Sequence, residues 1–191
     1  MNRRNSISTN AGARLRVRIY TMTGDEINAI IDSRTMHWRE LGEKHFAGRN
    51  DLSLIVLKGH LLLEQLLTAL ISHYCRPSGD LRQARLQFAQ KVGLVKAFVL
   101  FPFPSQFWEM LKVINQLRND FAHELEPKKL EEHLKTVRTM AATHRKTTEK
   151  EFLFVFDTDE GSLRFLISFW LGFLTPVDSL IHIMEKSKTY V

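Results

Sequence analysis

Residues 54–71, LIVLKGHLLLEQLLTALI, decide the fold of this chain. On a helix of 3.6 residues per turn, their Leu, Ile and Val side chains cover most of the circumference. A helix of this kind is stable when neighbouring elements bury it on several sides. Asp51 can cap its N-terminus, because a side-chain oxygen at that position accepts a hydrogen bond from the first turn. The segment therefore predicts a central, buried helix from residue 51 to about residue 74.

Further helical patterns precede and follow this central helix, separated by breaks that contain Gly, Pro, Asn or Asp. Thr23 or Gly24 can cap the first of them, and Ser105 can cap the one that follows the Pro-containing break. The predicted helices cover about residues 23–46, 81–99, 105 to before 127, 127–145 and 162–186. The expected fold class is all-α, an up-and-down bundle of about five to six helices.

The chain is expected to divide into three parts. Residues 1–22 are rich in Arg, Ser and Asn, which predicts a disordered basic leader. Residues 23–146 form the helical bundle. Residues 147–191 contain a segment at 151–157 that fits either a short strand or an aromatic loop, followed by a C-terminal apolar helix packed on the bundle.

The net charge of +6 is concentrated at the start of the chain. The first twenty residues contain five arginines and no acidic residue, so the remainder carries a net charge of only +1. Binding to nucleic acid through charge alone needs many cations to neutralise phosphates, and the bundle does not have this excess. The leader is either an arm that grips phosphate or an extension without a selected function.

Composition also limits the compartment and the cofactors. A single cysteine, Cys75, excludes a disulfide scaffold and a cysteine-rich zinc site, so we expect a protein of the reducing cytoplasm. The leader has no apolar stretch long enough for a signal peptide. The last helix contains Arg164, Pro176 and Asp178, which favour burial in the bundle or in a dimer over a membrane span.

The stretch LRNDFAH, residues 117–123, suggests chemistry. An arginine can hold phosphate oxygens and a histidine transfers protons near neutral pH, so Arg118 and His123 offer the groups needed to cut RNA without a metal ion. Two other Arg–His pairs, at positions 39 and 45 and at positions 138 and 144, have comparable spacing. They lack the flanking Leu, Asn and Ala of this stretch, and neither lies on a strongly apolar helix.

This motif and the apolar helix KGHLLLEQLL at residues 58–67 together resemble the HEPN superfamily, over residues 24–146. The signature of that family is an arginine followed after four to six residues by a histidine. The resemblance implies a small all-α bundle that, in many members, is a metal-independent ribonuclease of toxin–antitoxin, abortive-infection or CRISPR-linked defence systems. RNA would then be the substrate, and a cognate antitoxin or other defence-system protein a partner. Other members, such as the mannitol repressor and related regulators, lack catalysis and work through protein contacts.

The expected catalytic residues are Arg118, Asn119 and His123. His123 would be the general acid or base, Arg118 would stabilise charge on the phosphorane, and Asn119 would orient His123 or donate to a phosphate oxygen. Glu64, the only acid inside the central helix, is expected to pair with the desolvated Arg118, and HEPN proteins often have a polar or acidic residue there. Asp120 is expected to tune the site, and no metal or cofactor is predicted.

Plainer interpretations exist for several of these residues. Arg118 with Glu64 can be a purely structural ion pair, and a lone histidine on an interior helix, such as His60, is usually a core residue. Lys128 and Lys129 can contact the RNA backbone, although the glutamates around them fit an ordinary solvated face better. The competing function class is therefore a catalytically inactive regulatory or protein-interaction module.

The spacing of the motif raises the question of a second chain. His123 lies about 140° around an ideal helix from Arg118, whereas Asn115, Asn119 and His123 share one face. Either the helix loosens before Pro127, or the site is assembled between two chains. A two-fold dimer would bring two histidines to one cleft and supply both a base and an acid, as in HEPN ribonucleases. We therefore expect a homodimer in which the ends of these helices approach each other.

Overall fold

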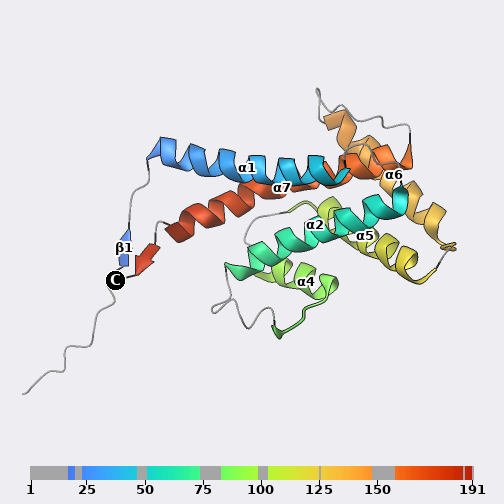
Figure 1. The fold of residues 1–191 in the computed structure, drawn as a ribbon, viewed down its shortest axis with the longest axis horizontal. Coiled ribbons are helices and arrows are strands. Elements are labelled where there is room, and N and C mark those ends of the chain that lie inside the picture. Colours follow the sequence, from blue (N-terminus) through green and yellow to red (C-terminus); the bar gives the residue numbers. More distant parts are fainter. Residues whose placement is uncertain are drawn as a thin grey trace, which may run out of the picture.

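The computed structural model describes residues 17–19, 23–46, 51–73, 83–98, 103–124, 126–147, 158–186 and 188–190. These ranges contain six helices and two three-residue strands (Figure 1). In chain order they are β1 (Val17–Ile19), α1 (Gly24–Phe46), α2 (Leu52–Ser72), α4 (Phe88–Phe98), α5 (Ser105–His123), α6 (Leu130–Thr147), α7 (Asp159–Lys186) and β2 (Lys188–Tyr190). The prediction of an all-α bundle of about five to six helices is confirmed.

Side-chain hydrogen bonds determine where the first two helices begin. Thr23 Oγ1 accepts a hydrogen bond from the backbone N–H of Glu26 at 3.3 Å, and Glu26 Oε2 accepts one from the backbone N–H of Thr23 at 2.8 Å. This reciprocal pair is a capping box. At α2, the Asp51 carboxylate accepts a hydrogen bond from the backbone N–H of Leu54 at 3.1 Å. Both caps were predicted from the sequence.

One predicted helix is not continuous, and one predicted cap is not formed. The helix expected from residue 81 is interrupted, and α4 begins only at Phe88. Arg85 has a φ of 46°, a left-handed conformation that cannot continue a right-handed helix. After it, the Gln90 side chain accepts a hydrogen bond from the backbone N–H of Gln87 at 2.8 Å. Ser105 is itself the first residue of α5, so the predicted serine cap is not formed.

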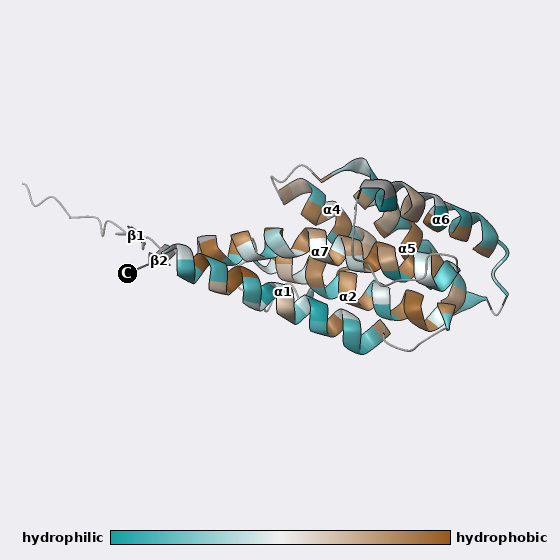
Figure 2. Cartoon of the chain, turned by 90° about the horizontal axis from the view of Figure 1, so that it is seen from above, coloured by the Kyte–Doolittle hydropathy of each residue, from teal (hydrophilic) through white to brown (hydrophobic). Residues whose placement is uncertain are grey.

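The core lies around α2 and α7. α2 packs against α4 and α5 as well as α7, as its nearly continuous apolar surface requires. Gly59 allows the close approach of α7, because a Cβ there would lie only 2.2 Å from Ile167 Cδ1. The rings of Phe107 on α5 and Trp170 on α7 are fully buried, with centroids 5.0 Å apart. Figure 2 shows many apolar positions along α2, α5 and α7, the helices that carry this core.

α1 and α7 run side by side and extend beyond the other helices (Figures 1 and 2). At their tip, β1 and β2 form an antiparallel pair in which Val17 is opposite Tyr190 and Ile19 is opposite Lys188. Part of the segment predicted as a disordered leader is therefore a strand. The remainder of that leader, and residues 148–157 with the predicted aromatic loop, lie outside the described residues.

Two helices, α2 and α7, are long and apolar enough to cross a membrane by length and composition. In both, 56% of the apolar window is buried inside the protein. The core helix of a bundle has the same length and composition, so this property does not distinguish the two cases.

Candidate functional site at the end of α5

The last turn of α5 carries the motif residues on its solvent side. The buried stripe of this helix runs through Phe107, Leu111 and Ile114 and ends at Leu117, the first residue of the motif. Asn119 and His123, one turn apart on the opposite face, are exposed.

Arg118 connects the buried stripe to this exposed face. Its side chain is half-buried, and Nη1 donates a hydrogen bond to Asn119 Oδ1 at 3.1 Å. The guanidinium is thereby held against the neighbouring Asn119, which shares the exposed face with His123. We call Arg118, Asn119 and His123 the α5 ledge.

The predicted ion pair between Glu64 and Arg118 is wrong. Glu64 Oε1 binds Lys91 Nζ of α4 at 2.8 Å, and its other oxygen lies 3.9 Å from His60 Nδ1. No carboxylate of the described residues forms an ion pair with Arg118. The physical reason is that α4 packs on α2 and brings its own cation to Glu64, while Arg118 extends toward Asn119.

His60 is a buried core residue that lies near the ledge. It forms a 3.2 Å hydrogen bond through Nε2 with Asn115 Oδ1 of α5, and its ring centroid lies 4.2 Å from that of Phe88. Burial lowers the pKa of His60 and outweighs the opposite influence of Asn115 and Glu64. The charge of Arg118 lowers it further, so this part of the core is electrostatically coupled to the ledge.

Asp120 has a partner that the sequence did not reveal. Its Oδ2 lies 2.9 Å from Nδ1 of His133, a buried residue in the first turns of α6. The two side chains join α5 to α6 next to the ledge. A sequence signal existed, because His133 precedes Leu134 on the inward-facing side of α6, where a polar side chain needs a hydrogen-bonding partner.

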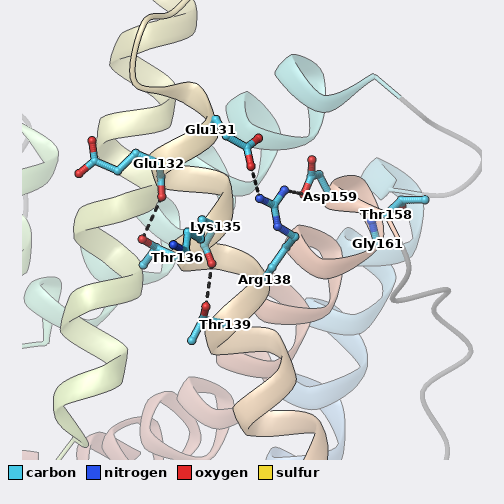
Figure 3. Close-up of polar contacts among 9 residues, drawn as sticks. All are labelled: Glu131, Glu132, Lys135, Thr136, Arg138, Thr139, Thr158, Asp159 and Gly161. Carbon is cyan, nitrogen blue, oxygen red and sulfur yellow. Dashed lines mark hydrogen bonds and ion pairs between the residues drawn. The ribbon is translucent and has the colours of Figure 1, made fainter.

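The basic residues of α6 are partly neutralised. Arg138 donates to Asp159 at the start of α7 at 2.7 Å and also pairs with Glu131 of its own helix (Figure 3). Lys128 and Lys129 are exposed in the turn before α6, and the Lys128 backbone N–H donates to Glu124 Oε2 at 3.2 Å. These two lysines thus remain accessible, while Arg138 serves to hold α6 to α7.

The two other Arg–His pairs of suitable spacing form no comparable site. Arg39 binds Glu43 on the exposed face of α1 at 2.9 Å. His144 stacks on Phe169, with ring centroids 4.7 Å apart. Among the residues that the structure describes, no group of three or more His, Cys, Asp or Glu side chains is arranged to hold a metal ion.

Comparison with known proteins adds no relative. A scan against models of protein families finds no match, and searches of curated proteins and of solved structures find no similar protein. The side chains at the end of α5 and the resemblance of their motif are therefore the features that point to a function.

Proposed function

We propose that this protein is a metal-independent endoribonuclease that cuts RNA at the α5 ledge. The proposal depends above all on one observation, the hydrogen bond from Arg118 to Asn119, which draws the guanidinium toward the exposed face that bears His123. An arginine whose partner is a neutral amide keeps its charge available for an anion. A phosphodiester is such an anion, and its neighbouring 2′-hydroxyl has a proton that a histidine can accept.

Each ledge residue has a role in this reaction. The planar guanidinium of Arg118 binds two phosphate oxygens together and stabilises the charge that grows on the phosphorane. Asn119 keeps that guanidinium on the exposed face. His123 transfers a proton to or from a reacting oxygen. Attack by the 2′-oxygen leaves a 2′,3′-cyclic phosphate and a 5′-hydroxyl, and requires no cation.

The motif resemblance to the HEPN superfamily supports the same chemistry and suggests a setting. We place the enzyme in the cytoplasm as a toxin or defence effector whose partners are RNA and a cognate antitoxin or another defence-system protein. Lys128 and Lys129, exposed beyond the ledge, would contact the RNA backbone. A homodimer in which two ledges approach each other is part of the proposal, because the exposed Asn119 and His123 can face a second copy.

The test is cleavage of mixed cellular RNA and of a labelled oligoribonucleotide by the purified full-length protein, with and without EDTA. We expect the same cleavage in both conditions, with 2′,3′-cyclic phosphate ends. Arg118→Ala and His123→Ala should each lower the rate by at least about 100-fold, the usual contribution of a charge-stabilising or proton-transferring group. Both variants should retain the helical circular dichroism of the parent.

Arg39→Ala is the matched control, because it removes an arginine that lies six residues before a histidine but is bound to Glu43. It should cut RNA like the parent protein. If the parent leaves every RNA intact, or if His123→Ala cuts as fast as the parent, the ribonuclease proposal fails. The catalytically inactive regulatory module would then be the better description.

A further inference from the structure

We propose that His133, held by Asp120, is the general base of the reaction and that His123 is the general acid. This inference rests on the proposed ribonuclease function and gives it a second proton-transferring group. It places both groups in one chain, whereas the sequence analysis favoured a dimer in which a second copy supplies one of them. The partner's His123 as base is the competing arrangement.

The Asp120–His133 contact fixes which ring nitrogen of His133 can act as a base. An ionised carboxylate only accepts hydrogen bonds, so at 2.9 Å from Asp120 Oδ2 the Nδ1 atom must carry the hydrogen. In the neutral ring, Nε2 then has a free lone pair. Nε2 is not among the fully buried polar atoms that lack a partner, and within the described part of the chain no residue other than Asp120 bonds to the His133 ring. Nε2 therefore keeps some contact with solvent, although the His133 side chain as a whole is only 11% exposed.

The electrostatic surroundings of His133 suit a base. The carboxylate of Asp120 has no lysine or arginine bound to it within the part of the chain that the structure describes. The acid Asp159 at the start of α7 is bound to Arg138. The positive charge that His133 gains with a proton is therefore stabilised by Asp120, in the way a buried aspartate stabilises the histidine of a hydrolytic triad.

Position on the helix brings the two histidines to either side of Asp120. His123 follows Asp120 by three residues, a spacing at which Cβ atoms lie about 5–6 Å apart on an α-helix. His133 touches the same carboxylate from α6. Asp120 thus links the two helices that carry these histidines, and in this proposal the phosphate held by Arg118 binds between them.

The reaction balances with these groups alone. His133 Nε2 takes the proton of the 2′-hydroxyl as the 2′-oxygen forms a bond to phosphorus. The bond from phosphorus to the 5′-oxygen breaks, and protonated His123 gives its proton to that leaving oxygen. The products are a 2′,3′-cyclic phosphate and a 5′-hydroxyl, and a proton exchanged with water returns both imidazoles to their starting states.

The experiment is a pH–rate profile of RNA cleavage by the parent, His133→Gln and His123→Gln. The parent should give a bell-shaped profile, because base and acid must be in opposite protonation states. His133→Gln keeps a donor for Asp120 but cannot accept a proton, so we expect a loss of at least about 100-fold and disappearance of the limb on the acidic side. His123→Gln should remove the limb on the alkaline side.

Asp120→Asn and His144→Gln separate a proton-transfer role from a packing role. Asp120→Asn no longer fixes the tautomer of His133, and we expect a loss of at least about 10-fold with an unchanged circular dichroism spectrum. His144→Gln removes another inward-facing histidine of α6 and should leave the shape of the profile unchanged. If His133→Gln does not fold, Asp120→Asn and the nitrogen-15 chemical shifts of His133 in the parent decide the matter, with hydrogen expected on Nδ1.

The possible failures are distinguishable. A parent that cuts no RNA overturns the proposed ribonuclease and this role of His133 with it. A parent that cuts RNA while His133→Gln keeps its rate and both limbs overturns only this inference and favours the partner's His123 as the base. Hydrogen on Nε2 of neutral His133 also overturns it.

Discussion

Two arginines of this bundle are held in opposite ways. Arg34 of α1 donates to the Asp178 carboxylate of α7 through Nε at 2.6 Å and also pairs with it through Nη2, and that carboxylate is completely buried. Trp38 Nε1 and His73 Nε2 lie 3.5 and 3.8 Å from the same group. Three helices, α1, α2 and α7, thus meet around one buried negative charge.

Arg118 at the end of α5 has the neutral amide of Asn119 as its hydrogen-bonding partner. The charge of Arg34 is cancelled within the protein, whereas Arg118 forms no ion pair with a carboxylate of the described residues. Removing the Asp178 partner of Arg34 should therefore affect stability, and removing Arg118 should affect RNA cleavage. The same residue type serves different purposes because a carboxylate faces one and an amide faces the other.

The largest expected effect on stability comes from Asp178→Ala. This change leaves the Arg34 guanidinium without its counter-charge, and we expect the free energy of unfolding to fall by about 3 kcal/mol. The estimate lies at the low end for buried pairs because the Arg34 side chain is 30% exposed. Urea denaturation followed by circular dichroism measures it. A decrease below about 1 kcal/mol would show that the cluster does not hold α1 to α7.

The same cluster should make stability sensitive to acid. Burial by itself raises the pKa of Asp178, but the nearby His73, the hydrogen bond from Arg34 and the charge of Arg34 outweigh it, so the net pKa lies below the ordinary 3.8. The stabilisation is fully present above 3.8 and is lost as the pH falls through the lowered value. Asp178→Asn should flatten this acidic decline in urea midpoints. An equally steep decline in the variant would assign it to other carboxylates.

The buried residue His60 should make a smaller contribution to the pH dependence of the free energy of unfolding. Its pKa is lowered from 6.5, chiefly by burial, so below that pH the unfolded chain binds a proton that the folded protein does not. The free energy of unfolding should therefore decrease as the pH falls from about 6.5 toward the lowered value. His60→Gln keeps a donor for Asn115 and should remove this component, measured by thermal unfolding between pH 7.5 and 5. An unchanged slope would exclude His60 as its source.

Arg118→Ala should change stability by only about 1 kcal/mol, because it removes one hydrogen bond to a neutral group. The same variant should lose RNA cleavage. Urea denaturation and cleavage assays on one preparation test both expectations together. A loss of stability as large as that of Asp178→Ala would mean that Arg118 is structural, and the contrast between the two arginines would disappear.

The smallest effect belongs to Glu43→Ala. This residue binds Arg39 on the surface of α1, where both side chains are well exposed. Exposed pairs of this kind contribute at most about 0.5 kcal/mol at ordinary salt concentrations. Urea midpoints within error of the parent would set the baseline for the comparison.

The sequence predicted those features that depend on residues close together in the chain. The caps at Thr23 and Asp51 need only three or four consecutive residues, and the buried nature of α2 follows from its own composition. That Asn119 and His123 share one face of the helix followed from helical periodicity in the same way.

Contacts between helices could not be predicted, because they depend on how the elements are arranged. Glu64 is paired with Lys91 because α4 lies against α2. α4 begins only after Arg85, whose left-handed conformation interrupts the helix predicted there. Arg34 and Asp178 are 144 residues apart in the chain. The pairing of Asp120 with a histidine depends on the angle at which α6 returns along α5.

The position of the β1–β2 pair determines where a tag, a fused domain or a surface is best attached to this protein. Both strands lie at the tip of the α1–α7 pair, and the end of α5 lies toward the opposite end of the long axis (Figures 1 and 2). An affinity tag, a fluorophore or a fused domain joined through either strand would emerge on the same side, far from the ledge. The protein can therefore be tethered to a surface by that tip while the α5 ledge at the other end stays accessible.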